Sequence, residues 1–502
     1  MRHRDRLALM IWVWALAASA IAKTPVKQPN VLFIAVDDLK PTLGCYGDGF
    51  AKSPNIDRLA SSGMVFMNAH CQQAVCAPSR ISLLTGLLPD TTRVWDLKTN
   101  VRDTLPDVVT LPQHFKQNGY EVVGMGKIFD PRSVGGREHM DTRSWSQPYL
   151  HPKSPADETF GYRAPKLVER ITAKKKELRG KGWDAALKVV GKFPTDVADV
   201  ADVDYFDGAM TDEGVRMIGE LSKGDKPFFL AVGFKKPHLP FNAPKRYWDL
   251  YDRETVPLAT IRDMPEGAPD FHFQPGWELR NYDRIPKEGR LPEDLQRELV
   301  HGYYACVSYI DALVGKLLDA VEGNGIADET IIILWGDHGW HLGDHSIWCK
   351  HTNFEQATRV PMILTVPGNE SRAQKTMAPV EFLDVFPTLC ELSGIPTPED
   401  LHGTSLLPLI DDPNGSIKRV ARSQYPRHSE HGPVMGYAYR DDRYRYIEWV
   451  QKRFMKGETD GPVVARELYD YEKDPDETRN LIDDPAYKEV VASMQAVAKK
   501  LR

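Results

Sequence analysis

The chain has 502 residues, of which 42% are hydrophobic and 27% are charged. These are ordinary proportions for a globular protein, and this length is ample for a large buried core and for more than one domain. The formal net charge of −6 gives no reason to expect nucleic acid or an anionic membrane as a partner. Any binding site for an anion must therefore be positive locally.

The first 22 residues have the pattern of a secretory signal peptide. Three arginines precede an apolar stretch at 7–17, and the small residues Ala20 and Ala22 offer cleavage positions. The stretch is too short to anchor the chain in a bilayer, and no second hydrophobic span follows. We therefore expect an exported protein, in a periplasmic, secreted or lysosome-like compartment, with no membrane span once the signal is removed.

Cysteines are sparse for an exported chain of this length. They contain no CxxC pair, so a disulfide scaffold is not expected, while a single bridge stays open. The six are Cys45, Cys71, Cys76, Cys306, Cys349 and Cys390.

From residue 30 to about 412, apolar runs typical of buried strands alternate with helical patterns. Such alternation predicts an α/β fold with a mostly parallel sheet and helices on both of its faces. Strands are expected at 30–36, 120–127, 226–234, 330–336 and 361–368. Helices are expected at 53–63, 110–119, 292–322 and 382–394.

The pattern changes after residue 412, and we expect a catalytic domain at 27–412 and a small α+β subdomain at 413–502. The subdomain is predicted to contain a hairpin with Asp441 and Asp442 at its turn, then a strand and a closing helix. The segment 130–203 is polar and is expected to be irregular. It is either an excursion that faces the substrate or a plain surface insertion.

Two clusters of polar side chains follow predicted strands. Asp37 and Asp38 come after the strand at 30–36, and Asp337 and His338 come after the strand at 330–336. Ligands bind beyond the carboxyl ends of strands in open α/β sheets. Either cluster alone also fits a turn with polar tips, but the two together favour a site for a divalent metal.

The stretch "AVCAPSRISLLTG" places Cys76 at the start of a predicted helix, with Pro78 in the first turn and Arg80 one turn further on. Helix-start N–H groups and an arginine fork both favour an anion. The cysteine itself fits a buried thiol, a thiolate nucleophile, a metal ligand or the precursor of another group. A thiolate nucleophile would need a base, usually a histidine.

Three further cationic side chains follow strands or adjoining loops. They are Lys127, His238 and Lys350. A lone lysine or histidine is most often a solvated surface group, but the placement of these after strands favours a common cleft.

At these residues the sequence resembles the type I, formylglycine-dependent sulfatase family. "CAPSR" matches its C-x-P-S-R signature, and "NVLFIAVDD" and "GDHGWHLGDH" resemble its two metal-ligand segments. "ELYDYEKDPDETRNL" resembles its C-terminal hairpin, and the similarity runs from about Lys27 onward. "GCYGD", "FFLAVGFKKPHLPF" and "DHGWHLGDHSIWCK" are closest to the iduronate-2-sulfatase branch. The resemblance implies an alkaline-phosphatase-like sandwich with a smaller C-terminal subdomain.

The resemblance also implies roles for the residues described above. A formylglycine-generating maturation enzyme would oxidise Cys76. One hydroxyl of the hydrated aldehyde attacks sulfur, and the second, which a serine lacks, later expels sulfate. The implied ligands of one divalent cation, expected to be calcium, are Asp37, Asp38, Asp337, His338 and the modified Cys76. Arg80, Lys127 and Lys350 would neutralise the sulfate, and His238 would protonate the leaving alcohol.

The implied substrate is a sulfated oligo- or polysaccharide, with a 2-O-sulfated uronic acid as the candidate sugar. The chain departs from the pattern at two positions: many sulfatases have Asn where His338 stands, and the branch has His at Asp130. We expect Asp130 to turn away from the sulfate and cap the loop at Pro131.

Two other functions remain as alternatives. One is a phosphodiesterase or phosphonate hydrolase of the same superfamily, which does not need the complete maturation signature seen here. The other is a non-catalytic polysaccharide-binding protein on a degenerate fold, which should have lost the cysteine or a ligand.

Overall fold

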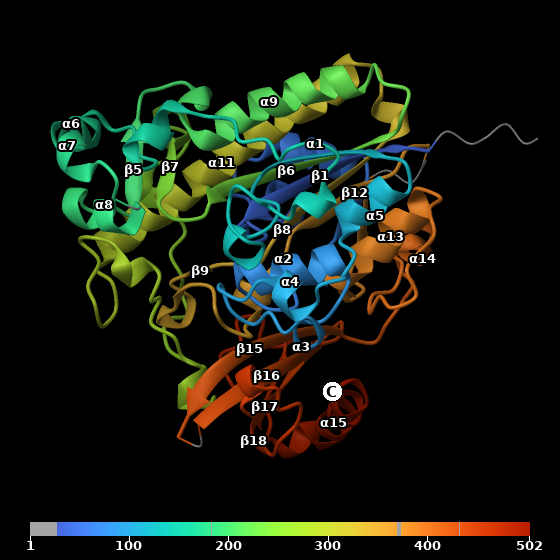
Figure 1. The fold of residues 1–502 in the computed structure, drawn as a ribbon. Coiled ribbons are helices and arrows are strands. Elements are labelled where there is room, and N and C mark those ends of the chain that lie inside the picture. Colours follow the sequence, from blue (N-terminus) through green and yellow to red (C-terminus); the bar gives the residue numbers. More distant parts are fainter. Residues whose placement is uncertain (1–27, 182, 369–372, 431) are drawn as a thin grey trace, which may run out of the picture.

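The computed structural model describes residues 28–181, 183–368, 373–430 and 432–502. The predicted signal peptide at 1–22 lies outside these residues. A seven-stranded sheet forms the centre, in the order β13-β2-β12-β8-β1-β6-β4. Helices cover both of its faces, and a smaller sheet with a terminal helix lies beyond one end of it (Figure 1).

The four strands β8, β1, β6 and β4 of the central sheet run parallel to one another. β12 is antiparallel to β8 and to β2, and β13 runs parallel to β2. The sheet is therefore mostly parallel, as predicted. Its strands are β1 (Asn30–Asp37), β2 (Met64–Phe66), β4 (Glu121–Gly126), β6 (Phe228–Pro237), β8 (Thr330–Gly336), β12 (Met362–Thr365) and β13 (Gln374–Thr376).

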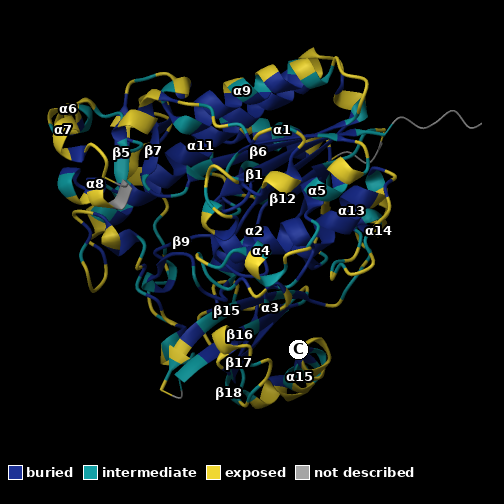
Figure 2. Cartoon of the chain, in the orientation of Figure 1, coloured by how far each residue is buried: buried dark blue, intermediate teal, exposed yellow. Residues whose placement is uncertain are grey.

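The sequence of β1 explains why helices cover both faces of the central sheet. Leu32, Ile34 and Val36 belong to one core cluster, while Val31 and Phe33 belong to the other. Because successive side chains of a strand point to opposite faces, a continuous apolar run needs a helix layer on each side. The central helices are accordingly buried, whereas yellow exposed positions gather at the periphery (Figure 2).

Five of the six main helices in these two layers fall on predicted helical patterns, whereas the helix at 206–221 was not predicted. The first face is covered mainly by α1 (Pro54–Ser61), α9 (Phe206–Leu221) and α11 (Glu293–Gly323). The second face is covered mainly by α2 (Cys76–Thr85), α5 (Leu111–Gln117) and α13 (Val385–Leu392). Further short helices of the larger part are α3 (Pro89–Thr92), α4 (Val101–Thr104), α10 (Lys245–Trp248), α12 (Glu355–Thr358) and α14 (Leu407–Asp411).

Short strands outside the main sheet complete this part. They are β3 (Ala69–His70), β7 (Phe241–Pro244), β9 (His341–Leu342), β10 (Trp348–Cys349), β11 (Arg359–Val360) and β14 (Val380–Glu381). β3, β11 and β14 form a three-stranded sheet, and β9 pairs with β10.

Two predicted helix starts differ in their capping. Thr110 caps α5, because its side chain accepts a hydrogen bond from the Gln113 N–H at 3.3 Å. Ser53 precedes α1 but makes no capping bond, since its Oγ accepts from the Gly44 N–H at 2.9 Å. The sequence pattern predicted both helix positions correctly. It did not predict that the Ser53 hydroxyl would bond the Gly44 N–H instead of capping α1.

The segment 130–203 is more regular than predicted. It contains α6 (Pro165–Ala173), α7 (Lys175–Leu178) and α8 (Trp183–Val190), and β5 (Thr195–Ala198) pairs in parallel with β7. A small core that includes Tyr162, Ile171 and Leu187 holds these helices together. The expectation of an irregular segment is therefore wrong for 165–198, where charged residues surround a narrow apolar stripe.

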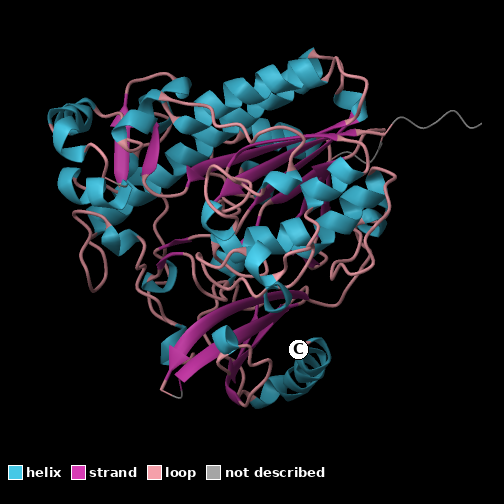
Figure 3. Ribbon diagram, viewed as in Figure 1, coloured by secondary structure: helices cyan, strands magenta, loops and turns pink. Residues whose placement is uncertain are grey.

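The C-terminal part forms a four-stranded antiparallel sheet, drawn in magenta in Figure 3. Its strands are β15 (Ala421–Ser429), β16 (Gly432–Arg440), β17 (Tyr444–Gln451) and β18 (Val463–Asp470), and α15 (Lys488–Leu501) follows. The Asp441 N–H donates to the Tyr444 carbonyl at 3.0 Å, so the hairpin turns where predicted. The first strand docks on the larger part, because the Gln424 N–H donates to the Gln72 carbonyl at 2.7 Å.

All six cysteines are free thiols in the structure, and five of them are buried. Among the described residues, no helix combines the length and the apolar character needed to cross a bilayer.

Candidate active site

The predicted site residues come together at the carboxyl ends of the parallel strands. β1 ends at Asp37 and is followed by Asp38, and β8 is followed by Asp337 and His338. Lys127 follows β4, whose neighbour β6 leads to His238. Cys76 and Arg80 come from the first turns of α2, and Lys350 follows β10.

Cys76 lies at the centre of this cluster. Its Sγ is 3.4 Å from each of three atoms: Asp37 Oδ1, His338 Nε2 and Lys127 Nζ. Burial and the Asp37 carboxylate raise the pKa of the Cys76 thiol well above its ordinary value. A resting thiolate nucleophile is therefore disfavoured, while a buried thiol, a metal ligand and the precursor of another group stay open.

His338 presents one ring nitrogen to the cluster. Its Nδ1 lies 3.0 Å from the Gly339 carbonyl, so an Nδ1–H can donate there. This tautomer leaves a lone pair on Nε2, which lies 3.3 Å from Asp38 Oδ1 and 3.6 Å from Asp337 Oδ1. A backbone partner that fixes the tautomer in this way is typical of histidines that bind metals.

A sharp turn aims Asp38 into the site. Its φ of 59° lies in the left-handed region, which aspartate tolerates better than most residues. The Asp38 N–H donates to Asp337 Oδ1 at 2.9 Å, and the Tyr303 hydroxyl donates to the Asp38 carbonyl at 2.8 Å. The first bond joins the ends of β1 and β8, and the second ties the turn to α11.

The donor set fits a divalent cation. Donor atoms of Asp37, Cys76, Asp337 and His338 lie within 4.8 Å of one another, and all four residues are buried. The Asp38 carboxylate joins Asp37 and Cys76 in an overlapping group. Three carboxylates gathered in the protein interior need compensating positive charge, and oxygen donors suit a hard cation such as Ca²⁺.

Two lysines supply part of that positive charge. Lys127 Nζ pairs with Asp37, and Lys350 Nζ lies 2.9 Å from Asp38 Oδ1. Burial opposes ionisation of Asp37, but Lys127, His238 and Arg80 together hold its pKa well below the usual range. At Asp38 burial outweighs Lys350, and the pKa is raised.

Arg80 is fully buried and holds the carboxylates in place. Its Nε donates to Asp337 Oδ2 at 2.8 Å, and one terminal nitrogen lies 3.4 Å from Asp37 Oδ1. The other terminal nitrogen donates to the carbonyls of Lys127 and Ile128. The guanidinium therefore links the ends of β1, β4 and β8.

His238 lies beside a carboxylate that the sequence reasoning missed. Its Nδ1 is 2.6 Å from the Leu239 carbonyl, and its Nε2 is 3.1 Å from Glu278 Oε1. Burial opposes a positive charge, but Asp38 and Glu278 raise the pKa of His238. Glu278 also lies 3.1 Å from Lys350 Nζ, although it comes from a coil segment with no strand or helix pattern to mark it.

Asp130 caps the loop at Pro131, as expected from the sequence. It precedes the short helical turn Pro131–Ser133, and its carboxylate accepts from the Arg132 N–H at 3.0 Å. The Arg132 guanidinium bonds the same carboxylate at 2.9 and 2.7 Å.

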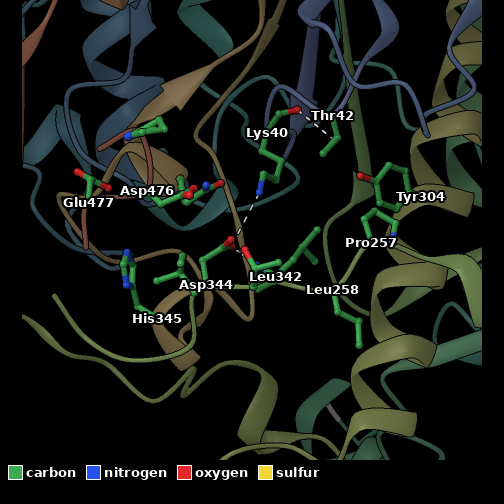
Figure 4. Close-up of a pocket in the computed structure, with 15 residues that line it drawn as sticks. Lys40, Thr42, Pro257, Leu258, Tyr304, Leu342, Asp344, His345, Asp476 and Glu477 are labelled. Carbon is green, nitrogen blue, oxygen red and sulfur yellow. Dashed lines mark hydrogen bonds and ion pairs between the residues drawn. The ribbon is translucent and has the colours of Figure 1, made fainter. Parts of the chain in front are cut away.

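A separate cavity of about 230 Å³ lies elsewhere in the molecule. Figure 4 shows the Lys40 ammonium pointing toward the Asp344 carboxylate across it, at 3.9 Å. Among the described residues that line this cavity, none is a predicted site residue. The cluster around Cys76 is thus a distinct site.

The fold has an alkaline-phosphatase-like architecture: a mostly parallel sheet with carboxylates at its carboxyl edge and Cys76 at a helix start beside them. The sequence pattern of the sulfatase family matches residues 29–395, so the chain belongs to the sulfatase family. The pattern of the C-terminal region of N-sulphoglucosamine sulphohydrolase matches residues 343–502.

Individual relatives agree with this assignment. Iduronate 2-sulfatase of Mus musculus is 35% identical over 549 residues, covering 96% of each chain. A structure solved with its substrate D-glucosamine-2-N,6-O-disulfate superposes with a TM-score of 0.71 at 20% identity, covering 94% of this chain and 97% of the other. A phosphonate monoester hydrolase from Silicibacter pomeroyi gives the same TM-score and identity, covering 94% and 95%. The chain is a sulfatase that hydrolyses sulfate esters, and the fold alone does not distinguish sulfate from phosphonate esters.

Proposed function

We propose that this sulfatase removes sulfate from a sulfated carbohydrate, with a 2-O-sulfated uronic acid as the favoured sugar. The extended similarity to a relative named iduronate 2-sulfatase supports this choice of sugar. A saccharide disulfate bound to a protein of the same fold supports the broader class of substrate.

The proposal includes a modified residue and a metal. Residue 76 acts as formylglycine, made from Cys76 by a maturation enzyme, and its hydrate supplies the nucleophilic oxygen. Asp37, Asp38, Asp337 and His338 would hold a divalent cation, expected to be calcium, together with residue 76. Such an ion supplies Lewis-acid polarisation of the sulfate group and favours the ionised nucleophile.

One observation carries the proposal: Cys76 Sγ lies 3.4 Å from a carboxylate, an imidazole and an ammonium at once. A structural thiol needs none of these partners. Lys127 and Lys350, which pair with Asp37 and Asp38, are the proposed groups that neutralise sulfate oxygens as charge develops. Arg80 adds positive potential and keeps Asp337 oriented.

His238 is the proposed general acid. With Nδ1–H directed at the Leu239 carbonyl, the proton on Nε2, which faces Glu278 at 3.1 Å in the structure, is the one that would pass from there to the leaving alcohol. The raised pKa of His238 favours the protonated form that this role requires.

Parallel assays of sulfate release and phosphonate ester hydrolysis test the function. The enzyme is produced with a formylglycine-generating enzyme and loaded with Ca²⁺, and the substrates are a 2-O-sulfated uronate and a phosphonate monoester. Faster turnover of the sulfate ester, lost in Cys76→Ala, is the expected result. Preferential phosphonate hydrolysis, or saccharide binding without turnover, would contradict the proposal and favour one of the two alternative functions.

The proposed setting is an exported compartment. It depends on the signal-like pattern of residues 1–22, and N-terminal sequencing of secreted protein would test it through a start just after Ala20 or Ala22.

A further inference from the structure

Glu278 is a charged group in the site to which no role has been assigned so far. It lies between two short helical turns, Asp270–His272 and Leu279–Asn281. One carboxylate oxygen is 3.1 Å from His238 Nε2 and the other is 3.1 Å from Lys350 Nζ. The Glu278 side chain keeps 23% of its surface exposed, whereas that of Lys350 keeps only 2%.

We propose that Glu278 is a specificity-determining residue: it accepts a hydrogen bond from the sugar hydroxyl adjacent to the carbon that carries the sulfate. This inference rests on the proposed function, because it assigns a partner to the leaving sugar in that same site.

The distances place Glu278 next to the leaving group. A general acid must come within about 3 Å of the oxygen that it protonates. Since Glu278 Oε1 is itself 3.1 Å from His238 Nε2, it lies no more than about 6 Å from that leaving oxygen. A hydroxyl on the neighbouring ring carbon falls within this range.

The charge of Glu278 determines what it can accept. Burial opposes ionisation, but Lys350 and His238 hold the pKa of Glu278 well below its ordinary value. An ionised carboxylate only accepts hydrogen bonds and offers about four lone-pair directions. Lys350 and His238 each take one direction, so about two directions remain for a donor on the substrate.

The same charge restricts the orientation of the sugar. Glu278 repels a substrate carboxylate and attracts a hydroxyl donor. In a 2-O-sulfated uronic acid the hydroxyl on C3 neighbours the ester, while the carboxylate on C5 lies across the ring. Such a sugar can therefore place its hydroxyl against Glu278 and keep its carboxylate away from it.

A double-mutant cycle between enzyme and substrate tests the inference. Wild-type enzyme, Glu278→Gln and Glu278→Ala are assayed on a 2-O-sulfated uronate and on its 3-deoxy counterpart, with kcat and KM measured separately. Loss of a hydrogen bond to a charged group should lower kcat/KM of Glu278→Ala on the hydroxyl-bearing substrate by about tenfold more than on the deoxy substrate. Glu278→Gln, which keeps a neutral acceptor, should lie between wild type and Glu278→Ala.

Glu298 offers a matched control. It also pairs with a cation, Arg284 at 2.8 Å, and its side chain is 16% exposed, but it lies outside the site. Glu298→Ala should leave the ratio between the two substrates unchanged, and thermal unfolding of every variant shows whether it folds.

The outcomes separate the inference from the proposed function. If Glu278→Ala lowers kcat/KM equally on both substrates, Glu278 only positions His238 and Lys350. If it lowers kcat/KM on neither substrate, Glu278 has no role in the site. Either result overturns the inference. If the wild-type enzyme releases sulfate from neither substrate, the proposed function itself is wrong.

Discussion

Asp130 and His238 have different proposed roles, one as the cap of a loop and the other as the general acid, and substitution should separate them. Asp130→Ala removes a carboxylate that is almost fully buried and accepts three hydrogen bonds from Arg132. Loss of the cap costs about 1 kcal/mol, and loss of the pair with the half-exposed Arg132 adds up to about 1 kcal/mol. The free energy of unfolding should therefore fall by about 1–2 kcal/mol, while kcat/KM falls by less than about tenfold. Asp130→Asn, which keeps the cap but not the charge, should lose less stability.

His238→Ala should give the opposite pattern. Without the acid for the leaving alcohol, kcat/KM should fall by roughly 10²–10⁴. The assay is steady-state sulfate release from one sulfated saccharide, compared with chemical unfolding of the same preparations. A larger kinetic loss in Asp130→Ala than in His238→Ala would refute the reasoning, because the Asp130 carboxylate would then have to contact the substrate.

Three further results are expected. The peptide that contains residue 76 in active enzyme should have a mass about 18 Da below its unmodified form, and full activity with only cysteine there would contradict the mechanism. Asp337→Ala should lose bound divalent metal, by elemental analysis, together with activity, whereas a fully active metal-free enzyme would exclude the metal site. Burial raises the pKa of Glu477 from 4.5 to about 7. Protonation of Glu477 therefore adds to the free energy of unfolding. This contribution is fully present below about pH 4.5 and is lost as the pH rises through 7. Glu477→Gln should reduce the difference in unfolding free energy between pH 5 and pH 8 by on the order of 1–3 kcal/mol, and parallel pH profiles for the two proteins would contradict this.

Periodicity in the sequence predicted the parallel centre of the sheet and most of its main helices, but not the short strands β2 and β13 or the helix α9. The apolar run at 30–36 predicts a strand buried on both faces, and the structure has β1 there with two separate cores. The polar residues after β1 and β8 could also be located, because strand ends of a parallel sheet meet at one edge.

The partners of these residues could not be predicted in the same way. Glu278 and His238 are 40 residues apart, and neither a strand nor a helix positions Glu278. Contacts of this kind depend on how a coil folds back over the sheet edge, which no local pattern encodes. The helices within 165–190 were missed for another reason: their apolar stripe is narrow, and it packs on a small core of its own.

The contact between β15 and the segment before α2 has a consequence for the order of events during synthesis. The Ser423 hydroxyl and the Gln424 N–H bond the carbonyls of Cys71 and Gln72, a few residues ahead of Cys76. Every residue of α2 is buried as well, so an enzyme that modified Cys76 could reach it only before this packing forms. Because β15 emerges late in translation, its docking would end the time available for the modification. A chain that folded before it was modified would retain an unreactive thiol in an otherwise complete site.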